Sequence, residues 1–171
     1  PCRYTMQGHP PERTIEPEIM KPAFGRVMIA HNIELRSDAT IKCFRPPESL
    51  RYEPLGAEFG PMKLSAIFEF IDMIQYDMDH YPTKKIVYMV PDGRQALTNA
   101  IFLLGSYMLL DLGRTPDQIS ETFSWATEDM IEPYFTSTKM CSETMLGLSD
   151  CWLGLDLARQ HGWGRSLSIS R

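Results

Sequence analysis

Residues 86–112 read IVYMVPDGRQALTNAIFLLGSYMLLDL, and this stretch decides the fold class. Its first five residues form an unbroken apolar run bounded by turn residues, which is typical of a central strand in a parallel or mixed sheet. Residues 91–95 form a loop, and residues 96–112 are apolar almost all round, which indicates a buried helix that ends before Gly113. A buried strand, a loop and a buried helix predict an α/β fold with a candidate site at the carboxyl end of the strand.

Three weaker patterns precede this stretch. Residues 26–31 are rich in β-branched and apolar side chains, residues 39–44 alternate between apolar and polar types, and both segments predict strands. Apolar residues recur at helical spacing between residues 61 and 79 and predict a helix with Pro61 in its first turn. Residues Pro1 to Lys21 hold four prolines and little apolar periodicity, so they predict an extended arm without a core element.

Two helices are predicted after the long apolar one. Thr115, Pro116 and Gln118 have the spacing of a capping box with proline at the first helical position, which marks a helix start. Ser142 is expected to cap the last helix, which ends near Gly162. The apolar face predicted for this last helix carries Leu148, Cys151, Trp152, Leu155 and Ala158.

The composition limits the functional classes. The chain has 171 residues and 43% hydrophobic content, which suits one domain. A net charge of -5 without clusters of Lys or Arg argues against a nucleic-acid interface and favours protein partners. The longest apolar stretch, Ala100 to Leu112, contains Gly105, Ser106 and Asp111 and falls short of the ~20 residues that span a bilayer, so we expect no membrane segment.

The four cysteines lack the spacing of a zinc site or of a redox pair. We expect free thiols, and therefore an intracellular location in a reducing cytoplasm or nucleus. A cysteine phosphatase requires an Arg six positions after its nucleophilic Cys, yet the residues six positions after these cysteines are Gly8, Ser49, Gly147 and Leu157. Nucleotide-binding glycine motifs, a hydrolase elbow and metal-ligand spacing around the histidines are also absent from the sequence, so no cofactor or metal is expected.

Several blocks of the sequence are specific enough to indicate a family, and they are YEP (52–54), EFGP (58–61), KKIVY (84–88), NAIFLLGSY (99–107), the Thr115-Pro116 helix start, LSDCWLGL (148–155) and QHGW (160–163). Together they resemble the N-terminal domain of the cell-division-cycle-fourteen dual-specificity phosphatases. The resemblance covers residues 24–163, and it leaves an extended arm at 1–23 and a tail at 164–171. It implies a dual-specificity phosphatase-like fold with a central mixed or parallel sheet flanked by helices.

In that family two phosphatase-like domains share one chain, and only the second carries the catalytic Cys and Arg. The resemblance places Met89 at the nucleophile position and Gln95 at the arginine position, which makes the phosphate loop degenerate. A thioether cannot be deprotonated to a nucleophile as a thiol can, and a neutral amide does not neutralise the charge of a phosphoryl transition state. We therefore expect a pseudophosphatase without activity of its own, whose parent, if longer, is a cell-cycle protein phosphatase. Arg94, beside the lost position, could still hold an anion.

The resemblance also implies protein partners. In the family this domain forms one wall of a groove beside the C-terminal phosphatase domain, where it helps select phosphorylated substrates with a basic residue after the phosphosite. The alternative is a freestanding structural protein, for which the fold is a building block in a cytoskeletal or axonemal assembly of a cilium. In either case docking is expected through the arm, residues 1–21, and through residues 152–171. Trp152 and Trp163 are the candidate anchors, with core packing as the competing interpretation.

Overall fold

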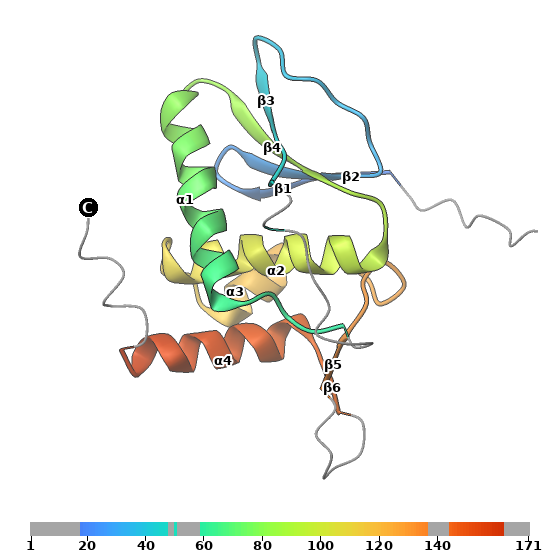
Figure 1. Ribbon diagram of the computed structural model, residues 1–171, viewed down its shortest axis with the longest axis vertical. Coiled ribbons are helices and arrows are strands. Elements are labelled where there is room, and N and C mark those ends of the chain that lie inside the picture. The colour runs from blue at the N-terminus through green and yellow to red at the C-terminus, as the bar shows by residue number, and fades with distance from the viewer. Residues whose placement is uncertain (1–17, 48–49, 51–58, 137–143, 163–171) are drawn as a thin grey trace, which may run out of the picture.

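The computed structural model of the chain describes residues 18–47, 50, 59–136 and 144–162 (Figure 1). In order, the elements of these ranges are β1 (Ile19–Phe24), β2 (Val27–His31), β3 (Ile41–Phe44), α1 (Leu64–His80), β4 (Lys85–Val90), α2 (Arg94–Leu110), α3 (Pro116–Thr122), β5 (Tyr134–Thr136), β6 (Thr144–Leu146) and α4 (Leu148–Gln160). Strands β2, β4 and β3 are parallel, and the sheet has the order β1-β2-β4-β3. Because β1 is antiparallel to β2, the sheet is mixed, and the predicted α/β class is confirmed. Strands β5 and β6 form a separate antiparallel pair.

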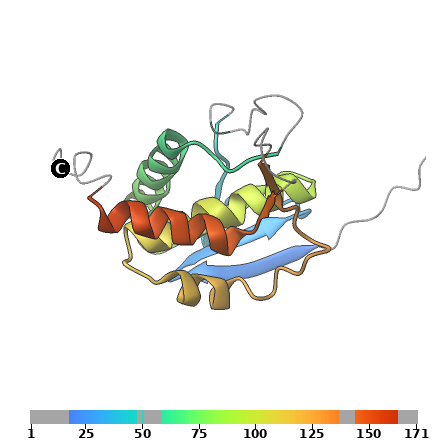
Figure 2. The ribbon, with the colours of Figure 1, turned by 90° about the horizontal axis from the view of Figure 1, so that it is seen from below.

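The elements form three layers (Figures 1 and 2). Helices α1 and α2 lie on one face of the sheet, and α4 lies on the far side of α2, next to α3. Strand β4 is central, and every residue from Ile86 to Val90 is buried. The predicted burial of Val87, Phe102 and Leu103 is therefore confirmed. No helix in the described ranges has both the length and the apolar composition that a bilayer crossing requires.

Helix α2 is buried all round because the sheet covers one side of it and α3 and α4 cover the other. All its residues from Leu97 to Leu109 are buried. The close approach of α4 depends on Gly105, where an added Cβ would lie 2.4 Å from the Trp152 ring. The Trp152 indole N–H donates to the Phe102 carbonyl at 3.3 Å, and the Ser106 hydroxyl donates to the same oxygen at 2.7 Å. Gly105 thus permits the close contact of the two helices, and the Trp152 indole bonds them to each other.

Arg26 lies between β1 and β2 and binds the carboxyl end of α1. Its guanidinium donates to the carbonyls of Tyr81 at 2.6 Å and Lys84 at 2.7 Å, and also to that of Met78. These oxygens belong to the last turn of α1 and to the turn before β4. A cation at this position also suits the negative end of the helix dipole. One side chain therefore fixes the path of the chain from α1 into β4.

Strand β3 ends the sheet on one side, and the preceding turn satisfies its outer edge. The amides of Ile41 and Cys43, which point away from β4, donate to Asp38 Oδ1 and Ser37 Oγ, each at 2.9 Å. The Ile41 carbonyl accepts the Asp38 N–H at 3.0 Å. Polar groups that an edge strand usually exposes are thus already bonded within the chain.

The prediction of an extended arm without a core element is wrong from Ile19 onward, because β1 begins at Ile19 and is part of the sheet. Ile19 and Ala23 are buried in the core, and Ile19 pairs with His31. Apolar periodicity fails to reveal this strand because it is short and contains Pro22, which an edge strand tolerates. Residues 1–17 lie outside the described residues.

Two helix starts also differ from the prediction. Helix α1 begins at Leu64 rather than at Pro61, because the preceding segment is engaged elsewhere: the Phe59 carbonyl accepts the Phe135 N–H at 2.7 Å. Helix α4 begins at Leu148 after Gly147, whose N–H donates to the Asp150 carboxylate at 2.9 Å.

The predicted cap of α4 is wrong, because the N-cap is Gly147; Ser142 lies outside the described residues. By contrast, the capping box of α3 is confirmed. The Thr115 and Gln118 side chains each accept the other residue's backbone N–H, at 3.3 and 3.2 Å.

We expect Gly105→Ala to lower the free energy of unfolding by about 1–3 kcal/mol, because the new methyl group would overlap the Trp152 ring. Alanine is by itself the better helix former, so the sign of the effect reports the contact and not the propensity. Denaturant unfolding measures the change.

The matched control for this prediction is Gly154→Ala on α4, where a Cβ meets nothing within 4 Å. It should raise the free energy of unfolding by about 0.5–1 kcal/mol. Equal stabilisation by both substitutions would show that α2 and α4 are further apart than described.

Candidate functional site

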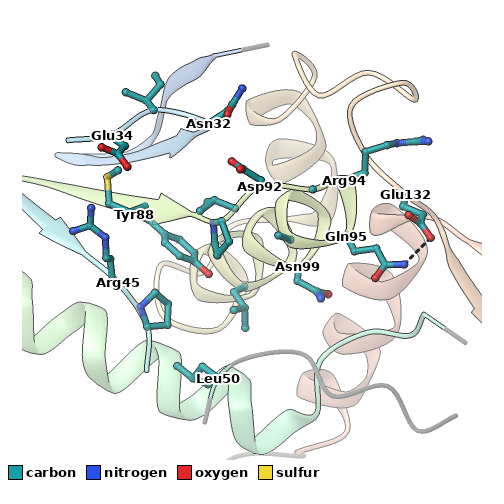
Figure 3. A pocket seen from close by; sticks show the side chains of 18 of the residues that line it. Asn32, Glu34, Arg45, Leu50, Tyr88, Asp92, Arg94, Gln95, Asn99 and Glu132 are labelled. Carbon is teal, nitrogen blue, oxygen red and sulfur yellow. Dashed lines mark hydrogen bonds between the residues drawn. The ribbon is translucent and has the colours of Figure 1, made fainter. Parts of the chain in front are cut away.

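A cavity of about 1180 Å³ lies at the carboxyl ends of β2, β3 and β4 (Figure 3). Residues that follow β2 and β3 line one side of it, and the β4–α2 loop and the first turns of α2 line the other. In open α/β sheets, ligands bind at this edge. The loop singled out in the sequence is therefore part of a cavity in a position suited to binding.

The three residues between β4 and α2 set the shape of the loop. Gly93 has φ of +109°, in a region that residues with a side chain rarely adopt, and it is the N-cap of α2. As a glycine, this N-cap residue has no side chain that could cap the helix, and the first turn of α2 holds no acidic residue. The amino end of α2 thus meets the cavity without a carboxylate of its own.

The three loop residues singled out in the sequence, Met89, Arg94 and Gln95, all line the cavity. Met89 is buried on the sheet face opposite α1 and α2. The Gln95 amide donates to Glu132 Oε1 at 2.9 Å. Of these two residues, Met89 is therefore part of the core, whereas Gln95 is exposed and bonded to Glu132.

Arg94 is turned toward the segment that follows α3. Its guanidinium donates to the carbonyl of Glu128 at 2.7 Å and to that of Ile131. Anion binding at Arg94 remains a prediction, and an anion would compete with these two bonds.

Thr98 fastens the same segment to α2. Its hydroxyl lies 2.9 Å from the Arg94 carbonyl and accepts the Glu132 N–H at 2.8 Å. Thr98 is buried, so these groups are removed from solvent. Glu132, which lines the cavity, is thereby held against α2 as part of one wall of the site.

Two residues with polar groups form the buried floor of the cavity, and the site prediction did not include them. Tyr88 and Asn99 are 6% and 7% exposed. Asn99 Oδ1 accepts the Tyr134 hydroxyl at 2.9 Å. Burial raises the pKa of the Tyr88 hydroxyl, so this group is protonated at neutral pH. A polar group inside an otherwise apolar strand or helix is the sequence signal that could have marked them.

Charged side chains line the cavity nearer to solvent. Glu34, Asp92 and Arg45 are exposed, and the Arg45 guanidinium donates to the Leu35 carbonyl at 3.1 Å. Glu132 is bonded to Gln95, as described above. The cavity thus combines a neutral polar floor with a rim of mixed charge.

The described cysteines lie away from this cavity. Cys43 is buried in β3, and Cys151 is on α4, where burial and the Asp150 charge raise the pKa of its thiol to about 11. Neither of them lines the cavity. Within the described ranges, no cluster of three His, Cys, Asp or Glu residues could hold a metal ion.

Of the two tryptophans predicted as docking anchors, only Trp152 lies among the described residues. Trp152 is 1% exposed and packs in the core, which argues against its use as an anchor. Trp163 and the tail lie outside the described residues. Helix α4 instead exposes Leu153 and Leu157, at 51% and 56%, which sequence reasoning did not single out.

Comparison with known proteins finds one matching family, described as the N-terminal half of dual specificity protein phosphatase, over residues 24–158. The chain is similar to dual specificity protein phosphatase CDC14C of Symphalangus syndactylus, with 27% identity over 130 residues, which cover 75% of this chain and 27% of that protein. It is 28% identical to CDC14B of Mus musculus over 122 residues, which cover 70% of this chain and 25% of that protein. It is 25% identical to CDC14A of Homo sapiens over 130 residues, 75% of this chain and 22% of that protein. The chain thus spans about a quarter of the length of these curated relatives.

We expect Thr98→Val to lower the free energy of unfolding by about 1–3 kcal/mol, because the isosteric side chain leaves the partly buried Glu132 N–H without its acceptor. Hydrogen exchange at the Glu132 amide should also become faster. The control is Thr122→Val, which removes a hydroxyl bonded to the Gln118 carbonyl at a partly exposed position and should change stability by less than ~0.5 kcal/mol. Unchanged exchange at Glu132 would mean that Thr98 does not hold this wall.

Proposed function

Since the chain belongs to the family of dual specificity protein phosphatase N-terminal halves, of the CDC14 type, we propose that it is a non-catalytic, phosphatase-like domain that docks substrates or protein partners. The observation that carries this proposal is the β4–α2 loop. It has the strand, loop and helix arrangement that a cysteine phosphatase uses to hold phosphate. The resemblance in sequence assigns Met89 and Gln95 to the positions where the reaction needs a thiolate and a guanidinium.

The surroundings of these two residues support the proposal. Met89 packs with Ala30, Cys43 and Val87, so its thioether is an ordinary part of the core. The Gln95 amide is bonded to Glu132, and a carboxylate there would oppose the negative charge that develops in phosphoryl transfer. Both contacts are compatible with a loop that has no reactive groups.

Exposed groups support a docking role. Leu153 and Leu157 are four residues apart on α4, so they lie on one face of the helix, and both are exposed. The exposed carboxylates of Glu34 and Asp92 at the cavity rim, with a net charge of -5 for the chain, suit a basic segment of a partner. In a parent protein phosphatase, the partners would be the catalytic domain and its phosphorylated substrates. The location that we propose is intracellular, in the cytoplasm, the nucleus or the cytoskeleton.

We expect no hydrolysis of p-nitrophenyl phosphate or of phosphopeptides by the 171-residue chain above the rate in buffer, because the loop lacks a nucleophile. The release of p-nitrophenol or phosphate measures this, with an active dual-specificity phosphatase domain as the assay control. Turnover that disappears in Cys43→Ser or in Cys151→Ser would overturn the proposal and place the active site elsewhere.

We expect the parent gene to encode a Cys-x5-Arg domain as well. We also expect the double variant Leu153→Gln, Leu157→Gln to bind that domain more weakly than the unchanged chain does. Both leucines are exposed, so the variant should keep its stability within about 1 kcal/mol. The control is Leu112→Gln, at an exposed leucine after α2. Sequencing of the transcript tests for the Cys-x5-Arg motif, and isothermal titration measures the binding of the variants. A transcript without the motif favours the alternative of a structural protein in a larger assembly.

A further inference from the structure

Helix α4 carries an apolar stripe that the described residues leave exposed. Leu153 and Leu157 are 51% and 56% exposed, and with Ser149 they lie at four-residue intervals along one side of the helix. The opposite side packs through Trp152 against α2, so the stripe points away from the core (Figure 2). Large apolar side chains that are exposed together mark a surface for another segment or another protein. The turn that ends α4 indicates which segment this is.

Gly162 turns the chain at the carboxyl end of α4. Its φ of +82° lies in the left-handed region, and it follows His161, which is the C-cap of the helix. Its N–H donates to the Arg159 carbonyl at 3.0 Å, which is the bond that the residue after the cap makes in a Schellman motif. An apolar contact between the next residue and the last turn of the helix frequently accompanies this motif. The described end of α4 therefore has the geometry that sends the chain back toward its own helix.

The sequence has a tryptophan at the position that makes this apolar contact. In the motif, the residue after the glycine contacts the third or fourth residue before the cap, and these are Ala158 and Leu157. The residue after Gly162 is Trp163. An indole ring can cover a large apolar area while its N–H remains in contact with water. The contact that the motif favours would thus form between Trp163 and the exposed side chain of Leu157.

The charges at the far end of the stripe are opposite to those of the C-terminal segment, residues 163–171. This segment carries two arginines and no acidic residue. The stripe leads from the carboxyl end of α4 to α3, because the Ser149 hydroxyl lies 3.1 Å from the Ser120 hydroxyl. Beside these two serines in the sequence are Glu121 and Asp150, whose side chains are exposed. A basic segment that follows the stripe thus approaches carboxylates that attract it.

From these features we propose that the C-terminal segment folds back on α4 and covers the stripe of Leu153 and Leu157, with Trp163 on Leu157. Its length suffices, since nine extended residues span up to about 30 Å and the 13 residues of α4 span about 20 Å. A partner that binds the same leucines has to displace the segment, which therefore controls access to this surface. The inference goes beyond the proposed docking role, and either can fail without the other.

The test is the fluorine NMR spectrum of the 171-residue chain labelled with 5-fluorotryptophan, which has one signal for each of the three tryptophans. Trp163→Phe identifies the signal of that residue. Leu157→Gln should shift this signal toward that of a free peptide with the sequence of residues 160–171, because the ring loses its apolar contact. The matched control is Leu112→Gln, at an exposed leucine after α2, which should leave the signal unchanged. Circular dichroism shows in each case that the variant is folded.

A second pair of variants tests the turn itself. Gly162→Ala opposes the positive φ, so it should release Trp163 and move its signal toward that of the peptide. The matched control is Gly113→Ala, which adds the same methyl group at a φ of +65° after α2 and should leave the Trp163 signal unchanged.

Three results would overturn the proposal. The first is a Trp163 signal in the unchanged chain that equals that of the peptide, and the second is a signal that either Leu157→Gln or Gly162→Ala leaves in place. The third is a signal that depends on protein concentration, because a second copy of the chain would then cover the leucines. Each of them leaves the proposal of a non-catalytic docking domain intact, since that rests on turnover and partner binding.

Discussion

The complete burial of α2 is the constraint on which the rest of the structure depends. A helix covered by a sheet on one side and by α4 on the other has no solvent-facing side for polar groups. Close packing against Trp152 is possible only because residue 105 is a glycine. At the amino end, Thr98 and Asn99 bring polar atoms into this buried environment, and they are satisfied by Glu132 and Tyr134. The same bonds that make burial of the helix possible therefore also build the wall and floor of the cavity.

An element or site residue could be predicted from the sequence where neighbouring residues in the chain determine it, and could not where distant residues do. Strand β4 and helix α2 could be predicted because each has a long apolar run, whereas β1 could not, because pairing with β2 makes it a strand despite Pro22. The loop was located for the same local reason. The floor was not, because a single Tyr or Asn in an apolar segment looks like core. Only the fold brings Tyr134 to Asn99 across 35 positions of sequence, and so decides which amide atoms face the cavity.

The loss of reactive groups that we propose is compatible with retention of the fold for an energetic reason. The stability of the β4–α2 unit comes from apolar burial on both sides of the loop, and a methionine at position 89 adds to that burial. Nothing in the packing of the described core requires a cysteine at this position or an arginine at position 95. Chemistry and architecture are therefore separable here, which is why membership of a phosphatase family by itself assigns no activity to the chain.

The outer edge of β3 has a consequence for self-association. Proteins with an open sheet edge can recruit strands from other chains and grow into ordered aggregates. Here Ser37 and Asp38 occupy the amides that an incoming strand would need, so growth from this edge would first have to break bonds within the turn. At this edge the backbone of β3 is therefore poorly suited to recruit a strand from a second copy of the chain.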